Sequence, residues 1–232
     1  MIPQFLRRLL PGERAELGVL AAIFIGAAAA LCFVLVASEM REGETAAFDR
    51  AMLLAFRDPA NLADPIGPPW LEGVVRDVTS LGSTALLTLI VVLSAGYLLV
   101  DRKRASAVLL LVSVIGGSVL SQVMKAVFGR ARPEIVPHLM TETSLSFPSG
   151  HAMNSAILYL TLGALLARAQ DGRWQQAYVF AATVLVALVV GISRVYLGVH
   201  WPTDVIAGWC VGAAWAMACL LAATWLERRP RR

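Results

Sequence analysis

Charged residues are scarce in this chain of 232 residues: Asp, Glu, Lys and Arg make up 16%, against 58% apolar residues. In a soluble domain about a quarter of all residues are usually charged, so this composition excludes an ordinary soluble protein. Cysteine is scarcer still. Cys32, Cys210 and Cys219 all lie inside apolar runs, with neither the spacing of metal ligands nor a disulfide framework. We expect them to be packing residues.

Long uncharged runs are abundant instead, and the mean hydropathy is +0.69. Six runs are long enough, or nearly so, to cross a hydrocarbon layer of about 30 Å. The sequence therefore predicts an all-α integral membrane protein with one domain over residues 1–232. The six expected transmembrane helices are 17–37, 81–100, 105–124, 152–167, 177–192 and 205–226. The fourth and fifth cover only roughly 24 Å, so the polar residues beside them are expected at or slightly below the membrane surface.

The first run follows three arginines, Arg7, Arg8 and Arg14, as the apolar core of a secretory signal would. It has 21 residues, however, which is longer than the about 7–15 residues of such a core. We expect a retained span, with cleavage near Ser38 as the alternative.

Basic residues are divided unevenly between the two sets of loops. Twelve of the twenty Lys and Arg residues lie in the two termini and in the loops after the second and fourth spans. Because cytoplasmic loops carry the excess of basic residues, both termini are predicted in the cytoplasm. The net charge of +4 then reflects topology and predicts no nucleic-acid partner.

Residues 39–80 form the longest stretch between spans. Phe48, Met52 and Phe56 recur at four-residue spacing opposite Asp49, which predicts a short amphipathic helix on the outer leaflet. We expect this segment to cover the bundle, with a role in lipid access as an alternative.

Prolines are concentrated in the second half of that segment. They predict an irregular backbone from residue 58 to residue 69, because proline donates no backbone hydrogen bond. A second short helix is expected over 70–78.

Four predicted helix ends meet on the outer, periplasmic side: the end of the third span, the start of the fourth, the end of the fifth and the start of the sixth. Polar residues gather at these ends, namely Lys125, Arg130, Arg132, Pro133, Pro148, Ser149, Gly150, His151, Ser193, Arg194, His200, Pro202 and Asp204. A cation near hydrocarbon costs up to about 2.5–3.5 kcal/mol, so such a cluster needs a bound anion or nearby carboxylates.

Carboxylates are too few in these outer loops, where only Glu134, Glu142 and Asp204 occur. A phosphate group, with two negative charges and forked acceptors, fits this deficit. Ser149 is placed to cap the fourth span, and Pro202 suits the first turn of the sixth. Free backbone donors at such helix starts also bind anions.

A histidine, a second histidine and an aspartate complete the arrangement. Asp204 follows His200 by four residues, a spacing at which the carboxylate can hold one imidazole nitrogen and leave the other free to attack phosphorus. His151 begins the fourth span and could give a proton to the departing oxygen. The neighbouring cations would stabilise charge on the phosphoryl oxygens.

Three blocks of this chain together resemble the signature of the type 2 phosphatidic acid phosphatase superfamily, which includes membrane lipid phosphatases and the vanadium haloperoxidases. The first block is Lys125, six residues and Arg132-Pro133. The second is Pro148-Ser149-Gly150-His151. The third is Ser193-Arg194, five residues, His200, three residues and Asp204.

The resemblance implies a six-helix membrane bundle that removes a phosphomonoester or pyrophosphate group from a lipid without a metal or other cofactor. Together with the compactness of the chain, it predicts a bacterial inner-membrane protein with its site on the periplasmic face. It implies that His200 forms a phosphohistidine, that Asp204 orients it and that His151 protonates the leaving group. It implies phosphate binding by Lys125, Arg132, Ser149, Gly150, Ser193 and Arg194. Arg130 and His138 lie outside the signature, and we expect both to be solvated loop residues.

Other functions remain open from the sequence. His151, His200 and Asp204 could instead be two histidines and a carboxylate on a metal ion, although the nearby arginines would repel it. The cluster could also be the binding site of a phosphate or lipid carrier or the active site of a haloperoxidase. Within the phosphatase hypothesis, the phosphoryl group could be transferred to another lipid instead of water. Phosphatidic acid, phosphatidylglycerol phosphate, undecaprenyl pyrophosphate and phosphorylated lipid A all fit as substrates. No obligate protein partner is expected.

Overall fold

The computed structural model of the chain describes the backbone of residues 4–227 and the side chains of residues 18–227. The arginines counted above in the two termini lie outside the described side chains. The elements are α1 (Gln4–Glu42), α2 (Ala46–Leu54), β1 (Arg57–Asp58), β2 (Asn61–Pro65), α3 (Pro69–Ser80), α4 (Thr84–Val100), α5 (Arg104–Phe128), α6 (Gly150–Arg168), α7 (Arg173–Tyr196) and α8 (Pro202–Glu227).

The all-helical membrane fold is confirmed, with one difference in how the spans are built. Five helices (α1, α5, α6, α7 and α8) are long and apolar enough to cross a membrane. A sixth crossing exists only if α3 and α4 are taken together, since the chain bends there by 46°. Ser83 causes a new start at this break because its hydroxyl accepts a hydrogen bond from the Leu86 N–H at 3.3 Å and caps α4.

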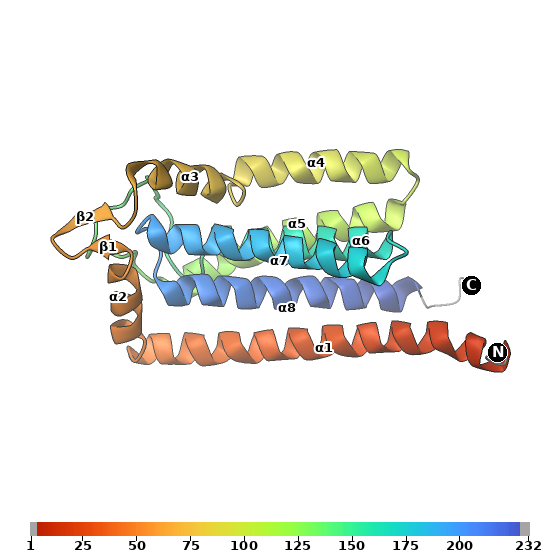
Figure 1. The fold of residues 1–232 in the computed structure, drawn as a ribbon. Coiled ribbons are helices and arrows are strands. Elements are labelled where there is room, and N and C mark those ends of the chain that lie inside the picture. Colours follow the sequence, from red (N-terminus) through yellow and green to blue (C-terminus); the bar gives the residue numbers. More distant parts are fainter. Residues whose placement is uncertain (1–3, 228–232) are drawn as a thin grey trace.

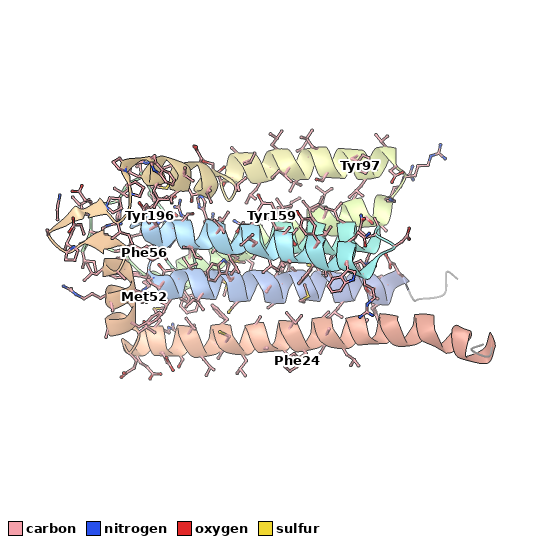
Figure 2. All side chains as sticks on the ribbon, in the orientation of Figure 1. Phe24, Met52, Phe56, Tyr97, Tyr159 and Tyr196 are labelled. Atoms are coloured by element: carbon pink, nitrogen blue, oxygen red, sulfur yellow. The ribbon has the colours of Figure 1, made fainter. Side chains whose placement is uncertain are left out.

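Helix α6 occupies the middle of the bundle, where α5, α7 and α8 pack against it, while α1 lies outside against α8 (Figure 1). Figure 2 shows Phe24 on the side of α1 that faces away from the other helices, and its side chain is 75% exposed. Gly208 and Gly212 let α8 approach α6 closely. A Cβ atom on Gly208 would lie 2.8 Å from the Ser149 carbonyl oxygen, and one on Gly212 would lie 2.7 Å from the Met153 carbonyl oxygen.

The site end of the bundle is the end that carries α2, the hairpin β1–β2 and α3, opposite the start of α1 and the end of α8 (Figure 1). The expected amphipathic helix is α2, and Phe48 and Met52 are exposed on it. The expected second helix is α3. Asp49, however, is buried against the bundle, although its place opposite the apolar face had suggested a solvent-exposed residue.

The expectation of an irregular backbone after α2 is wrong, because β1 and β2 pair antiparallel there. The hairpin packs onto the end of α7 through Phe56, whose ring centroid lies 6.0 Å from that of Tyr196 (Figure 2). The prolines do not prevent the hairpin, because Pro59 lies in its turn and Pro65 is the last residue of β2. Cys32, Cys210 and Cys219 are free and half-buried within their helices.

Candidate active site

His200 and Asp204 form a buried pair at the site end. His200 lies in the short connection between α7 and α8, and Asp204 lies in the first turn of α8. The imidazole Nδ1 is 3.3 Å from Asp204 Oδ2. The same carboxylate oxygen accepts hydrogen bonds from the Trp201 N–H at 2.9 Å and from the Ser146 hydroxyl. The pair is therefore held in one orientation by the start of α8 and by the loop before α6.

Arg132 defines the tautomer of His200. Its Nη1 lies 3.2 Å from the imidazole Nε2 and also donates to the Val199 carbonyl at 2.6 Å. A guanidinium has only donors, so Nε2 accepts this hydrogen bond and carries a lone pair. The proton then sits on Nδ1 and is directed at Asp204. Burial lowers the pKa of His200 well below its usual value, and the positive charges of Arg132, Arg194 and Lys125 lower it further.

Lys125 and Arg132 are joined through the loop before α6. The Lys125 ammonium donates to the Ser144 hydroxyl at 2.9 Å and to the Leu145 carbonyl at 2.7 Å. Arg132 donates to the same hydroxyl at 3.1 Å and to the Ser144 carbonyl at 2.7 Å. Gly129 ends α5 in the left-handed conformation, with φ of 61°, and turns the chain into this loop. Both cations are thus positioned by backbone carbonyls and by one serine.

Arg194 is fully buried in the last turn of α7 and forms an ion pair with Glu142. Glu142 also lies 3.5 Å from Arg132. Burial alone would raise the pKa of Glu142, but the charges of Arg194 and Arg132 outweigh it and hold this pKa below its ordinary value. Lys125, Arg132 and Arg194 therefore outnumber the two carboxylates that act on them, Glu142 and Asp204.

His151 lies in the first turn of α6, on another side of the same cluster. Its ring is close enough to interact electrostatically with Arg194, Glu142 and Lys125, and with His200 itself. The break between α3 and α4 packs against it, since a Cβ atom on Gly82 would lie 3.2 Å from the His151 Cδ2. The six residues Lys125, Arg132, His151, Arg194, His200 and Asp204 are thus brought together from α5, α6, α7, α8 and their connections.

The three small residues of the expected site differ in position. Ser149 caps α6, as expected, and its backbone N–H donates to the Asp204 carbonyl at 2.9 Å. Gly150 lies beside Lys125, since a Cβ atom there would be 3.6 Å from the lysine Cε. The Ser193 hydroxyl is turned to its own helix and donates to the Val190 carbonyl at 2.6 Å. Ser193 thus faces the site less directly than its place in the signature suggests.

The expectation for Arg130 is wrong, and the count of carboxylates near the cations was incomplete. Arg130 is no solvated loop residue: its guanidinium contacts Asp204 Oδ1 and Asp49 Oδ2, each at 2.6 Å. Asp49 was not counted because it lies 81 residues away, on α2. His138 is exposed, as expected, with its Nε2 at 2.5 Å from the Pro133 carbonyl oxygen.

The arrangement of the side chains does not support a metal site built on the two histidines and Asp204. Among the residues whose side chains are described, no three His, Cys, Asp or Glu side chains are grouped as metal ligands. The Asp204 carboxylate is already engaged by Arg130, Ser146 and the Trp201 N–H. This donor set suits an anion better than a divalent cation.

Comparison with known proteins agrees with this geometry. The sequence profile of the PAP2 superfamily matches residues 106–228. Phosphatidylglycerophosphatase B of Bacillus subtilis is 39% identical over 63% of this chain and 72% of its own length. Undecaprenyl-diphosphatase of Sulfolobus acidocaldarius is 36% identical over 50% of this chain and 54% of its own length, so the chain spans about half of that relative.

A solved structure extends the likeness to the whole bundle. The crystal structure of a transmembrane PAP2-type phosphatidylglycerolphosphate phosphatase from Bacillus subtilis has a TM-score of 0.77 and 30% sequence identity, over 90% of this chain and all of that one. The matched profile covers more than half of the residues and includes every block of the signature. The chain therefore belongs to the PAP2 superfamily.

Proposed function

We propose that this protein is a membrane lipid phosphatase that hydrolyses a phosphomonoester or pyrophosphate group through a phosphohistidine on His200, without a metal ion. The observation that carries the proposal is the imidazole whose unprotonated Nε2 lies beside Arg132. Family membership and the phosphatase names of the relatives support the reaction class.

In the first half-reaction, Nε2 of His200 attacks the phosphorus atom. The N–P bond forms as the bond from phosphorus to the lipid oxygen breaks. His151 enters this step as an imidazolium, which the bound phosphate favours, and gives that oxygen its proton. Asp204 stabilises the imidazolium through Nδ1–H, at the 3.3 Å contact already present. Lys125, Arg132 and Arg194 bind the phosphoryl oxygens, where their positive charges offset the negative charge of the phosphate.

In the second half-reaction, water attacks the phosphorus atom on the phosphohistidine. The O–P bond forms while the N–P bond breaks, and His151 accepts the proton from water. Inorganic phosphate leaves and His200 regains its free Nε2. The backbone N–H groups at the start of α6, capped by Ser149, are placed to share in binding the phosphate.

The site end is the part of the molecule that we assign to the outer face of the inner membrane. It lies opposite the start of α1 and the end of α8, so the cytoplasmic termini expected from the basic residues support a periplasmic site (Figure 1). The exposed Phe48 and Met52 on α2 suit contact with the outer leaflet, from which a lipid substrate would enter.

Phosphate release from a panel of lipids tests the function. The purified protein is incubated in mixed micelles with phosphatidic acid, phosphatidylglycerol phosphate, undecaprenyl pyrophosphate and phosphorylated lipid A, each with excess chelator. We expect release from at least one lipid at a rate that the chelator does not change. No release from any lipid would argue for a carrier, and release only without chelator would refute the metal-free reaction.

The pH dependence of the reaction follows from His200. Its neutral form is the nucleophile, and its pKa is depressed by burial and by the surrounding cations. The acid-side fall of kcat/KM is therefore expected below the pH of about 6.5 at which a free imidazole titrates. Because a phosphomonoester titrates near pH 6 itself, two substrates of different phosphate pKa are compared. An acid limb at or above pH 6.5 with both substrates would contradict the depressed pKa.

A further inference from the structure

Asp49 is a buried carboxylate outside the signature residues. It lies on α2 and contacts the first turn of α8, where Oδ1 accepts from the Thr203 N–H at 2.9 Å and Oδ2 accepts from the Thr203 hydroxyl at 2.7 Å. Burying a carboxylate is costly unless donors or a cation compensate for the lost water. Here both oxygens have partners, and one of them is Arg130.

Arg130 bridges this carboxylate and the one that contacts His200. Its Nη2 is 2.6 Å from Asp49 Oδ2, and its Nη1 is 2.6 Å from Asp204 Oδ1. The Nη1 also donates to the Thr203 hydroxyl at 2.8 Å, and the guanidinium lies 5.6 Å from the centre of the Trp201 ring. These four contacts, to Asp49, Asp204, Thr203 and Trp201, favour one orientation of the guanidinium.

The two oxygens of Asp204 are therefore held by different parts of the protein. Oδ2 faces the His200 Nδ1, Ser146 and the Trp201 N–H, while Oδ1 is held by Arg130. Without Arg130, Oδ1 would lose its cation, and only the donors to Oδ2, Ser146 and the Trp201 N–H, would hold the carboxylate against rotation about χ2. Arg130 thus adds the hold on Oδ1 and balances the charge of Asp204.

We propose that Asp49 and Arg130 are positioning residues that orient Asp204, and through it His200, so that helix α2 is part of the phosphohistidine site. This inference rests on the proposed function. Its geometric basis is the chain of contacts from Asp49 to Arg130, from Arg130 to Asp204 and from Asp204 to His200. Phe48 and Met52 are exposed on the same helix, so the residues that meet the lipid and the residue that anchors Arg130 belong to one short element.

Arg130→Gln and Arg130→Lys test the pair, with Arg50→Gln as the matched control because Arg50 is exposed beside Asp49 on the same helix. Each variant is purified as the full-length chain, and its thermal unfolding is checked against that of the wild type. Its kcat and KM are then measured as a function of pH on a lipid that the wild type hydrolyses. We expect Arg130→Gln to lower kcat by about 10- to 100-fold with little change in KM, because the nucleophile is misoriented while the phosphate cations remain. Arg130→Lys should restore part of the loss.

The acid limb of kcat/KM separates positioning from a merely structural role. The charged groups that face His200 are Asp204 on α8, Lys125 on α5, His151 on α6, Arg194 on α7 and Arg132 on the loop before α6. Removing the Arg130 charge leaves Asp204 less compensated, which favours protonated His200. The limb should therefore move to higher pH in Arg130→Gln and stay in place in Arg50→Gln.

Asp49→Asn provides the second half of the test, with the exposed Glu44→Gln as its control. If the two residues act as one unit, Asp49→Asn lowers kcat and the double variant loses less than the product of the two single losses. A loss in Arg130→Gln or Asp49→Asn no greater than in its control, or a loss in Arg130→Gln with an unmoved acid limb, would overturn the proposal. Both results require an active wild type, so inactivity of the wild type on every lipid refutes the proposed function instead.

Discussion

Replacing His200 with alanine is expected to lower phosphate release by roughly four orders of magnitude or more, because the variant lacks the proposed nucleophile. The His200 imidazole is fully buried, and its Nε2 lies 3.2 Å from Arg132 Nη1. A slow release of phosphate can remain in this variant, because Lys125, Arg132 and Arg194 are still present to bind the phosphate and stabilise its charge.

The same variant separates the phosphatase from a carrier. The cations do not need His200 to bind an anion, so His200→Ala should retain affinity for inorganic phosphate or vanadate, measured by calorimetry in detergent. A carrier would keep lipid or phosphate transport in this variant. Hydrolysis at the wild-type rate by His200→Ala would remove the basis of the proposed reaction.

Replacing Arg132 with alanine is expected to lower kcat/KM by about 10²- to 10³-fold. Arg132 has two roles in the structure: it contacts the Nε2 of His200 at 3.2 Å, and it provides one of the three charges around the imidazole. Its loss removes a phosphoryl contact and leaves Glu142 with Arg194 alone. Arg132→Lys should recover only part of the activity, since an ammonium cannot reproduce the forked contacts to Ser144, Val199 and His200.

Arg76→Ala is the control for this substitution, because Arg76 is an exposed arginine on α3 that forms an ion pair with Glu72, four residues before it. It should change kcat/KM by less than twofold. Steady-state assays of both variants on one lipid decide the matter. Equal activity of Arg132→Ala and Arg76→Ala would show that Arg132 does not contact the phosphoryl group during the reaction.

The residues at the centre of the site could be predicted because each stands next to an apolar run. Long uncharged runs determine where the chain crosses the membrane, and a charge beside such a run must have a partner. Order along the chain then brings Lys125, His151, Arg194 and His200 to one end of the bundle. The family resemblance, confirmed by the comparisons, rests on these same residues. Their roles in catalysis stay predictions.

The contacts that hold these residues could not be predicted. Asp49 and Arg130 are 81 residues apart, and Arg194 and Glu142 are 52 apart. Nothing in local spacing connects such pairs, because they depend on how α2 and the loop before α6 fold over the helix ends. Ser146 is a further example, since its hydroxyl reaches both members of the His200–Asp204 pair only through the path of that loop.

Helix ends were underestimated for a related reason. Hydropathy ends the fifth span at residue 192, whereas α7 continues to Tyr196. The continuation holds because Ser193 and Arg194 find partners inside the protein: the Val190 carbonyl for the hydroxyl, and Glu142 for the guanidinium. Polar residues end an apolar run in the sequence without ending the helix.

Trapping the reaction intermediate tests the central claim most directly. The protein is mixed with a lipid that carries a labelled phosphate, quenched in alkali during turnover and digested, and the peptides are identified by mass spectrometry; a phosphorus–nitrogen bond survives alkali and breaks in acid. The account predicts an acid-labile label on the peptide that contains His200, absent in His200→Ala. Continued release of phosphate with no label on His200 at any time point would contradict it.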